Sequence, residues 1–152
     1  MAQIIMWLLL IGPWFLFPLF NKERIKRFMP VGLFAALVLT VVFQIAEKLD
    51  WWIIKENIFF LTNITPFVYG AFLVGTVIIF YLSYPSFIIY MVLNILFDLF
   101  QAFVMHPIFE WTKIYEVNHI NSIGLFFLMI SIAIIIYLYQ KWQDEAFKDE
   151  VR

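Results

Sequence analysis

The chain has 152 residues, of which 64% are hydrophobic and 14% are charged, and its net charge is -1. Soluble domains are about half apolar and about a quarter charged, so the composition excludes an ordinary soluble domain and predicts a bilayer as the solvent. With two histidines, no cysteine and no basic excess, the sequence excludes disulfides and gives no reason to expect a zinc site or a nucleic-acid partner. It also lacks the motifs that bind nucleotides or metals, so we expect no cofactor.

Five apolar segments approach the roughly 20 residues that a membrane-spanning helix needs. They lie near residues 4–20, 31–46, 66–83, 84–105 and 120–140. We therefore predict an all-α integral membrane bundle of five transmembrane helices, forming a single domain over 1–152. The first two segments are short, and Pro13 and Pro18 are expected to bend or shorten the first of them. Pro85 is expected to lie in a tight turn between the third and fourth helices.

Basic residues are unevenly distributed between the two ends of the predicted bundle. Residues 21–27 and the tail from 141 onward hold seven Lys and Arg residues, whereas the loops at 47–65 and 106–119 hold three. Because basic residues accumulate on the cytoplasmic side, we expect a multi-pass protein of a plasma membrane with its N-terminus outside and its C-terminus in the cytoplasm. Both outer loops are rich in aromatic residues and are expected to lie on the membrane surface.

The fourth apolar segment carries a stripe of polar residues. Tyr90, Asn94, Asp98 and Gln101 have the spacing i, i+4, i+8, i+11, which places them on about a quarter of the circumference of a helix. An aspartate in mid-span costs on the order of 2.5 to 3.5 kcal/mol, so the stripe is predicted to face the bundle interior or a wet cavity. No Lys or Arg is predicted within the spans, and we expect Asp98 to be protonated at rest and to donate a hydrogen bond.

A structural role for the stripe is the alternative, because amide side chains commonly join membrane helices by hydrogen bonds. Gln44, Thr76 and Ser131 are the expected partners in that case. Gly32 and Ala36 form a small-xxx-small pair, a pattern that favours the close approach of two helices.

The fourth helix is expected to end at Met105, because the residue before a proline disfavours helical geometry. His106, Glu110 and His119 would then lie near the outer membrane surface, with Asp98 about two turns below it. A carboxylate beneath a rim of His and Glu is a candidate acid–base set or proton relay. The alternative is a solvated loop with ordinary charges.

The segment HPIFEWTKIYEVNHINSIGLFF (106–127) follows this long apolar helix. Through Pro107, Ile108, Phe109, Trp111 and Tyr115 it resembles the C-terminal half of a family of small, five-span membrane proteins from spore-forming Gram-positive bacteria. The opening IGPWFLFPLFNKERIKR resembles that family's short first span and basic loop. The chain departs from the pattern where His106 stands in place of an acid. The resemblance implies a topology and a bacterial origin, and it implies no reaction, because the family has no established activity.

No residue can be assigned a catalytic role from these patterns, and three functions are compatible with them. Short loops and the absence of cofactor motifs favour a non-catalytic accessory or binding protein whose partner is a lipid or a protein, with a homo-oligomer left open. The second function is a membrane enzyme that acts on a lipid or isoprenoid through Asp98 with His106 or Glu110. The third is a small proton-linked transporter, for which five spans are few and no pair of broken helices is found. The candidate polar site comprises Asp98, Asn94, Gln101, Tyr90, His106 and Glu110.

Overall fold

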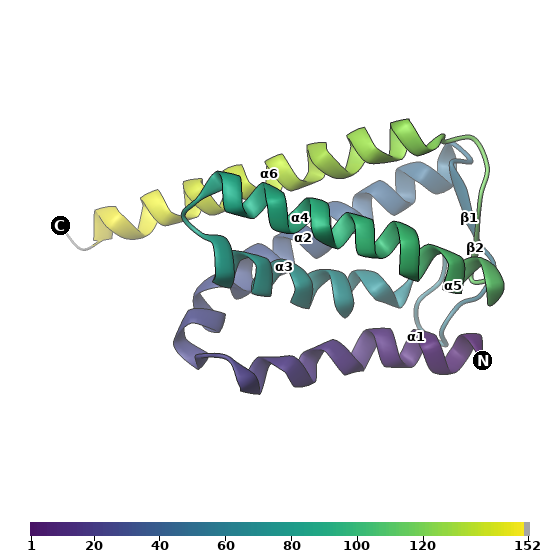
Figure 1. Cartoon of the computed structure of the whole chain (residues 1–152), viewed down its shortest axis with the longest axis horizontal. Coiled ribbons are helices and arrows are strands. Elements are labelled where there is room, and N and C mark those ends of the chain that lie inside the picture. Colours follow the sequence, from purple (N-terminus) through teal and green to yellow (C-terminus); the bar gives the residue numbers. More distant parts are fainter. Residues whose placement is uncertain (151–152) are drawn as a thin grey trace.

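The computed structural model describes residues 1–150, so Arg152 of the predicted basic tail lies outside the described residues. The described chain contains five helices that are long and apolar enough to cross a membrane, as the sequence predicted. The N-terminus and the C-terminal end of the last span lie at opposite ends of the bundle (Figure 1), as an odd number of spans requires. The five helices cover Ala2–Leu19, Lys22–Lys48, Pro66–Ser83, Phe87–Trp111 and Ile123–Lys148.

The first span changes its helical type where the prolines begin. It is an α-helix over α1 (Ala2–Ile11) and a 3-10 helix over η1 (Gly12–Leu19). Pro13 and Pro18 both lie in the 3-10 part, because a proline supplies no N–H and its ring crowds the preceding helical turn. The α-helical part of the first span therefore ends at Ile11, before the first of these two prolines.

The second helix, α2 (Lys22–Lys48), is longer than the predicted 31–46 and includes the basic stretch that was expected to be a loop. Asn21 caps its N-terminus, and its side-chain oxygen accepts hydrogen bonds from the N–H groups of Glu23 and Arg24 at 3.0 and 3.2 Å. Glu23 in the first turn also matches the positive end of the helix dipole. The helix therefore starts at its polar cap rather than at the edge of its apolar run.

The third and fourth helices are joined by the predicted tight turn. A short 3-10 helix, η2 (Pro66–Val68), leads into α3 (Ala71–Ser83), and α4 (Phe87–Phe100) begins after the turn that contains Pro85. The Tyr137 hydroxyl of the last helix donates a hydrogen bond of 2.7 Å to the carbonyl of Pro85, which holds the turn against the bundle.

The prediction that the fourth helix ends at Met105 is wrong. After α4 the chain forms one π-helical turn, η3 (Gln101–Met105), and then continues as α5 (His106–Trp111). In the π turn the N–H of His106 bonds to the carbonyl of Gln101, five residues back, so the register shifts by one residue. Pro107 consequently falls at the start of α5, where a missing N–H is tolerated.

The loops at 47–65 and 106–119 pair with each other, which the all-α prediction did not include. Strand β1 (Trp52–Ile54) is antiparallel to β2 (Tyr115–Val117), with Trp52 opposite Val117 and Ile54 opposite Tyr115. This β1–β2 sheet lies across the end of the bundle near the N-terminus (Figure 1). An exposed ion pair of 3.1 Å joins Lys55, which follows β1, to Glu116 of β2.

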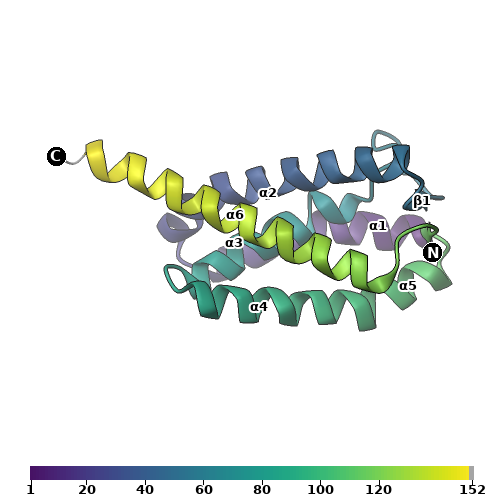
Figure 2. The same ribbon diagram turned by 90° about the horizontal axis from the view of Figure 1, so that it is seen from above.

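The last helix, α6 (Ser122–Glu150), runs beyond the predicted end at residue 140 into the charged tail. Its C-terminal part extends past the other helices (Figure 2). The tail is rich in Lys, Glu and Gln, which are good helix formers, so the end of the apolar run does not end the helix.

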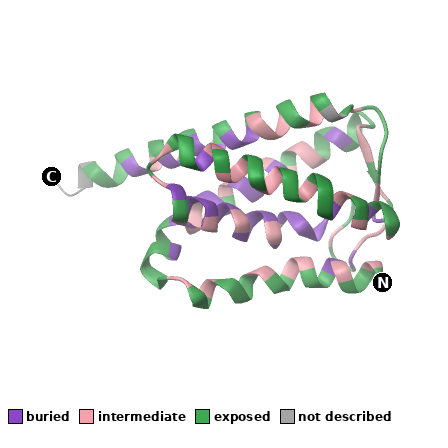
Figure 3. Cartoon of the chain, in the orientation of Figure 1, coloured by how far each residue is buried: buried purple, intermediate pink, exposed green. Residues whose placement is uncertain are grey.

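The third span, Pro66–Ser83, forms the centre of the bundle, and 61% of it is buried against 6% of the first span. Its helix α3 packs against α2, α4 and η1, while α6 covers α2 and α4. The buried positions accordingly concentrate on α3 (Figure 3). The predicted close approach at Gly32 is confirmed, because a Cβ there would lie 2.5 Å from a methyl group of Val77. Ala36 on the same face is buried.

Candidate functional site

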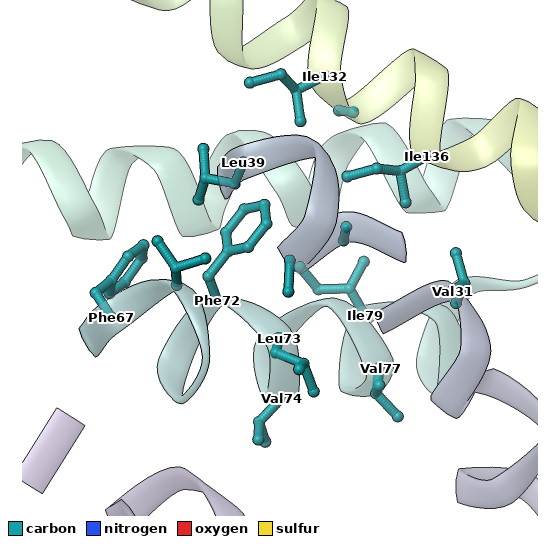
Figure 4. Packing of buried hydrophobic residues seen from close by; sticks show 14 of the residues in the cluster. Val31, Leu39, Phe67, Phe72, Leu73, Val74, Val77, Ile79, Ile132 and Ile136 are labelled. Atoms are coloured by element: carbon teal, nitrogen blue, oxygen red, sulfur yellow. The ribbon is translucent and has the colours of Figure 1, made fainter. Parts of the chain in front are cut away.

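Asp98 and Asn94 of α4 line a small cavity of about 10 Å³ between α3, α4 and α6. Thr76 of α3 is the third polar residue of this Asp98 cavity, and Asp98 itself is half-buried. Figure 4 shows four of the apolar wall residues in the core, Phe72 and Ile79 from α3 and Ile132 and Ile136 from α6. Two of the predicted stripe residues are thus brought together on an inward-facing surface.

The other two stripe residues do not line the Asp98 cavity. Tyr90 is fully buried, and its hydroxyl donates a hydrogen bond of 2.8 Å to the Ala133 carbonyl of α6, so it joins two helices. Gln44 and Ser131, which were expected to form hydrogen bonds with the stripe, are exposed. The Ser131 hydroxyl instead donates a hydrogen bond of 2.8 Å to the Phe127 carbonyl of its own helix.

A second cavity, of about 80 Å³, lies beneath the β1–β2 sheet. Gln101 lines it, and the Gln101 Oε1 atom is buried with no hydrogen-bond partner among the described residues. Gln101 is also the first residue of the π turn, a type of distortion that is frequent at functional sites. The walls of this sheet cavity are formed by Leu39, Phe43, Trp52, Ile54, Thr65, Phe67, Gln101, Phe109, Tyr115, Val117, Leu125 and Met129.

His106 connects the wall of the sheet cavity to Glu110. Its Nδ1 atom lies 2.6 Å from the Tyr115 hydroxyl, and its Nε2 atom lies 3.4 Å from a carboxylate oxygen of Glu110. Glu110 is exposed and Tyr115 lines the cavity, so the three side chains form a chain from solvent to the cavity wall. His106 and Glu110, the two residues that were predicted to act with Asp98, thus contact each other, and Tyr115 is the member that sequence reasoning had not assigned.

His119 and Asp98 lie apart from this chain. The His119 ring is exposed, and its Nδ1 atom lies 2.8 Å from the Asp50 carbonyl. Asp98 lines the small cavity, whereas His106 and Glu110 lie on α5 beyond the π turn. Within residues 1–150 the structure gives no hydrogen bond from Asp98 to either of these two residues.

Tyr115 is expected to resist ionisation well above the usual range for tyrosine. Burial and the nearby Glu110 carboxylate raise its pKa from 10 to about 12. Because the folded-state pKa lies above the unfolded value, this group's contribution to stability is complete below about pH 10 and is lost as the pH rises through about 12. Ultraviolet difference spectra between the wild type and Tyr115→Phe should therefore show Tyr115 about one tenth ionised at about pH 11. A tyrosinate signal from Tyr115 at about pH 10 would contradict this assignment.

Sequence reasoning missed a charged cluster at the opposite end of the bundle. A guanidinium nitrogen of Arg27 lies 3.3 and 3.1 Å from the two carboxylate oxygens of Asp144, whose residue is only 9% exposed. Gln140, one turn earlier on α6, donates a further hydrogen bond of 3.1 Å to Asp144. Gln140 and Asp144 have the spacing i and i+4, which predicts a contact only on a helix. The sequence prediction ended the last helix at residue 140, so this contact was not predicted.

No family model, curated protein or solved structure matches this chain. The two cavities and the groups that line them are therefore the features from which a function can be inferred.

Proposed function

We propose that this chain is a non-catalytic, multi-pass membrane protein that binds a lipid, with the end of an apolar chain held in the sheet cavity. The proposal places it in a bacterial plasma membrane with its N-terminus outside and its C-terminus in the cytoplasm. The observation that carries it is an apolar cavity with a few convergent polar groups, closed by strands from two distant loops.

The sheet presents its apolar side to this cavity. Trp52 and Ile54 of β1 line the cavity, whereas the intervening Ile53 points away and is exposed. Tyr115 and Val117 of β2 repeat the pattern around Glu116. Because of this alternation, the side of the sheet that faces the cavity is apolar, which favours the binding of a hydrocarbon chain.

The size of the cavity limits what enters it. At about 80 Å³ it is smaller than the roughly 150 Å³ apolar cavity that accommodates benzene, so it holds the end of a chain rather than a whole lipid.

The experiment uses Trp52 as the reporter, because its ring lines the cavity. In nanodiscs of phosphatidylglycerol with brominated acyl chains, we expect quenching of Trp52 fluorescence, measured as the difference between the wild type and Trp52→Phe. Leu125→Phe, which fills the cavity, should reduce this quenching at least about threefold, since it removes space for the chain. Leu138→Phe is the matched control, because Leu138 lies on the same helix and is 58% exposed. Equal quenching in the Leu125→Phe and Leu138→Phe proteins would contradict the proposal.

A lipid-modifying enzyme is the second candidate, favoured by the Glu110–His106–Tyr115 chain that ends on the wall of the sheet cavity. Such a chain has the groups of a proton relay for general acid–base catalysis. Mass spectrometry of the same nanodisc lipids distinguishes the two candidates. An altered lipid that accumulates with the wild type but not with Tyr115→Phe would favour the enzyme, whereas unaltered lipids favour the binding protein.

A further inference from the structure

A groove lies between the N-terminal part of α2 and the C-terminal part of α6, at the end of the bundle opposite the β1–β2 sheet. Its volume is about 640 Å³, which is within the usual range for a ligand site. Three of the lining residues are basic and one is acidic, which leaves a net charge of +2, and we call it the basic groove. It is lined by Lys26, Arg27, Pro30, Gln143, Asp144, Phe147 and Lys148.

The basic groove lies where the apolar parts of both helices end. On α2 the basic stretch ends at Arg27 and the apolar run begins at Phe28. On α6 the apolar run ends near residue 140 and a charged segment follows. In a bilayer, such a change from apolar to charged residues occurs at the level of the headgroups. The phosphate groups of the surrounding lipids therefore lie at the height of this groove.

The basic side chains of the groove retain groups that can bind an anion. Both hydrogen bonds from Arg27 to Asp144, at 3.3 and 3.1 Å, come from Nη2, so this pair does not use the N–H groups on Nη1 and Nε. Lys26 lies 3.2 Å from Glu23, but both side chains are exposed, and such a pair holds the ammonium group only weakly. Lys148 is exposed as well. With Arg27 compensating Asp144, the two lysines supply the net positive charge.

The groove also has an apolar part. Pro30 and Phe147 line it beside the basic residues, and Phe147 is 57% exposed. A free inorganic anion would leave this apolar surface in water. A phospholipid covers it, because its charged phosphate is attached to glycerol and acyl chains. The combination of surfaces therefore favours a lipid over a free anion.

We propose that the basic groove binds the headgroup of one anionic phospholipid, whose phosphate is held by Lys26, Arg27 and Lys148. Basic pockets between membrane helices on the cytoplasmic side bind headgroups of this kind. A zwitterionic lipid carries its own ammonium group, which opposes the positive charge of the groove, so the site prefers anionic lipids. The groove and the sheet cavity lie at opposite ends of the bundle, so this inference does not depend on the function proposed above.

Native mass spectrometry of the full chain in detergent tests this site. The protein is mixed with equal amounts of phosphatidylglycerol and phosphatidylcholine that have the same acyl chains, and the amount of each bound lipid is measured. We expect phosphatidylglycerol to bind at least about tenfold more tightly. Inorganic phosphate in excess should lower the bound phosphatidylglycerol less than about twofold, because free phosphate does not cover the apolar part of the groove. Equal binding of the two lipids, or full displacement of phosphatidylglycerol by inorganic phosphate, would overturn the proposal.

Variants localise the bound lipid. Lys26→Gln with Lys148→Gln should lower the affinity for phosphatidylglycerol at least about tenfold, since each basic residue contributes to binding an anionic lipid. Lys22→Gln with Lys141→Gln is the matched control, because it removes the same charge from the same two helices outside the groove, and it should lower the affinity less than about threefold. All four lysines are exposed, so both proteins should fold. Equal losses in the two double variants would contradict the proposal. Leu125→Phe, which fills the sheet cavity, should keep the preference for phosphatidylglycerol, and this distinguishes a failure of the groove from a failure of the sheet cavity.

Discussion

Replacing Gly70 with alanine is expected to separate the first helix from the bundle and to lower the free energy of unfolding by about 1 to 3 kcal/mol. Gly70 precedes α3, and its Cα faces the backbone of α1. A Cβ there would overlap the Leu9 carbonyl oxygen and would lie 2.7 Å from both the Cα and the carbonyl oxygen of Leu10. Because these are backbone atoms, no change of rotamer can relieve the overlap, and α1 must move away.

The first helix is the element that would move, because it packs against the rest of the bundle along one side only. Met6 is its only buried residue among those described, and the polar contacts of the first span reach loops rather than helices. The Gln3 side chain donates to the Asn57 carbonyl at 3.0 Å, and the Trp14 ring nitrogen donates to the Tyr69 carbonyl at 3.2 Å. A displacement of α1 therefore breaks few interactions apart from its packing on Gly70.

The natural absence of cysteine supplies a direct readout of this displacement. Met6→Cys introduces a single thiol at a position that is 1% exposed, so its reaction with a maleimide should be slow in the otherwise wild-type chain and fast when Gly70→Ala is added. Gly12→Ala is the control, because a Cβ there would meet only a Leu8 side-chain atom at 3.8 Å. Slow labelling together with an unchanged unfolding temperature in Gly70→Ala would contradict the prediction.

The number and approximate place of the five helices could be predicted because long apolar runs have few structural solutions. In lipid the backbone must satisfy its own hydrogen bonds, and a segment of about 20 apolar residues does so as a helix. The close packing at Gly32 was also predictable, since small residues at i and i+4 let two helices approach.

The ends of the helices were harder to predict, because they depend on local polar interactions. With Asn21 as its cap, α2 begins at Lys22, nine residues before the predicted start at 31, and the π turn carries the fourth helix past Pro107. The strands β1 and β2 are three residues each, too short for a periodic signal, and their pairing depends on loops that are far apart in the sequence.

The part of the candidate site that could be predicted lies on the regular α-helical part of the fourth helix, before the π turn. Asn94 and Asp98 share a cavity because they are one regular turn apart. Gln101 begins the π turn, whose wider geometry rotates the following side chains relative to those before it, and it faces a different cavity. The sheet cavity also needs β1, β2, α2 and α6 as walls, and no pattern within one segment specifies such a combination.

Methionine in place of Arg27 is expected to lower the free energy of unfolding by about 2 kcal/mol, because it leaves the buried carboxylate of Asp144 without its cation. Arg27 reaches both carboxylate oxygens, and its guanidinium also lies over the rings of Phe28 and Tyr84 at 5.3 and 5.6 Å. The Arg27 side chain is 55% exposed, so the loss should be smaller than for a fully buried pair.

Lys26→Met is the matched control, since it removes the same charge from the neighbouring residue. Lys26 pairs with Glu23 at 3.2 Å, but both side chains are more than 70% exposed. An exposed pair of this kind contributes at most about 0.5 to 1 kcal/mol, so Lys26→Met should change the unfolding temperature little. The comparison separates the Arg27–Asp144 contact from the general loss of a basic residue.

The double variant Arg27→Met with Asp144→Leu tests whether the ion pair between these two residues stabilises the packing of α2 against α6. Removing both charges also removes the unpaired carboxylate, so the double variant should recover at least half of the stability that Arg27→Met loses. Thermal unfolding of the four proteins of this cycle gives the coupling energy between the two residues. If the double variant is as unstable as the sum of the single variants, Arg27 acts through its contacts with the aromatic rings, and the ion pair does not link the helices.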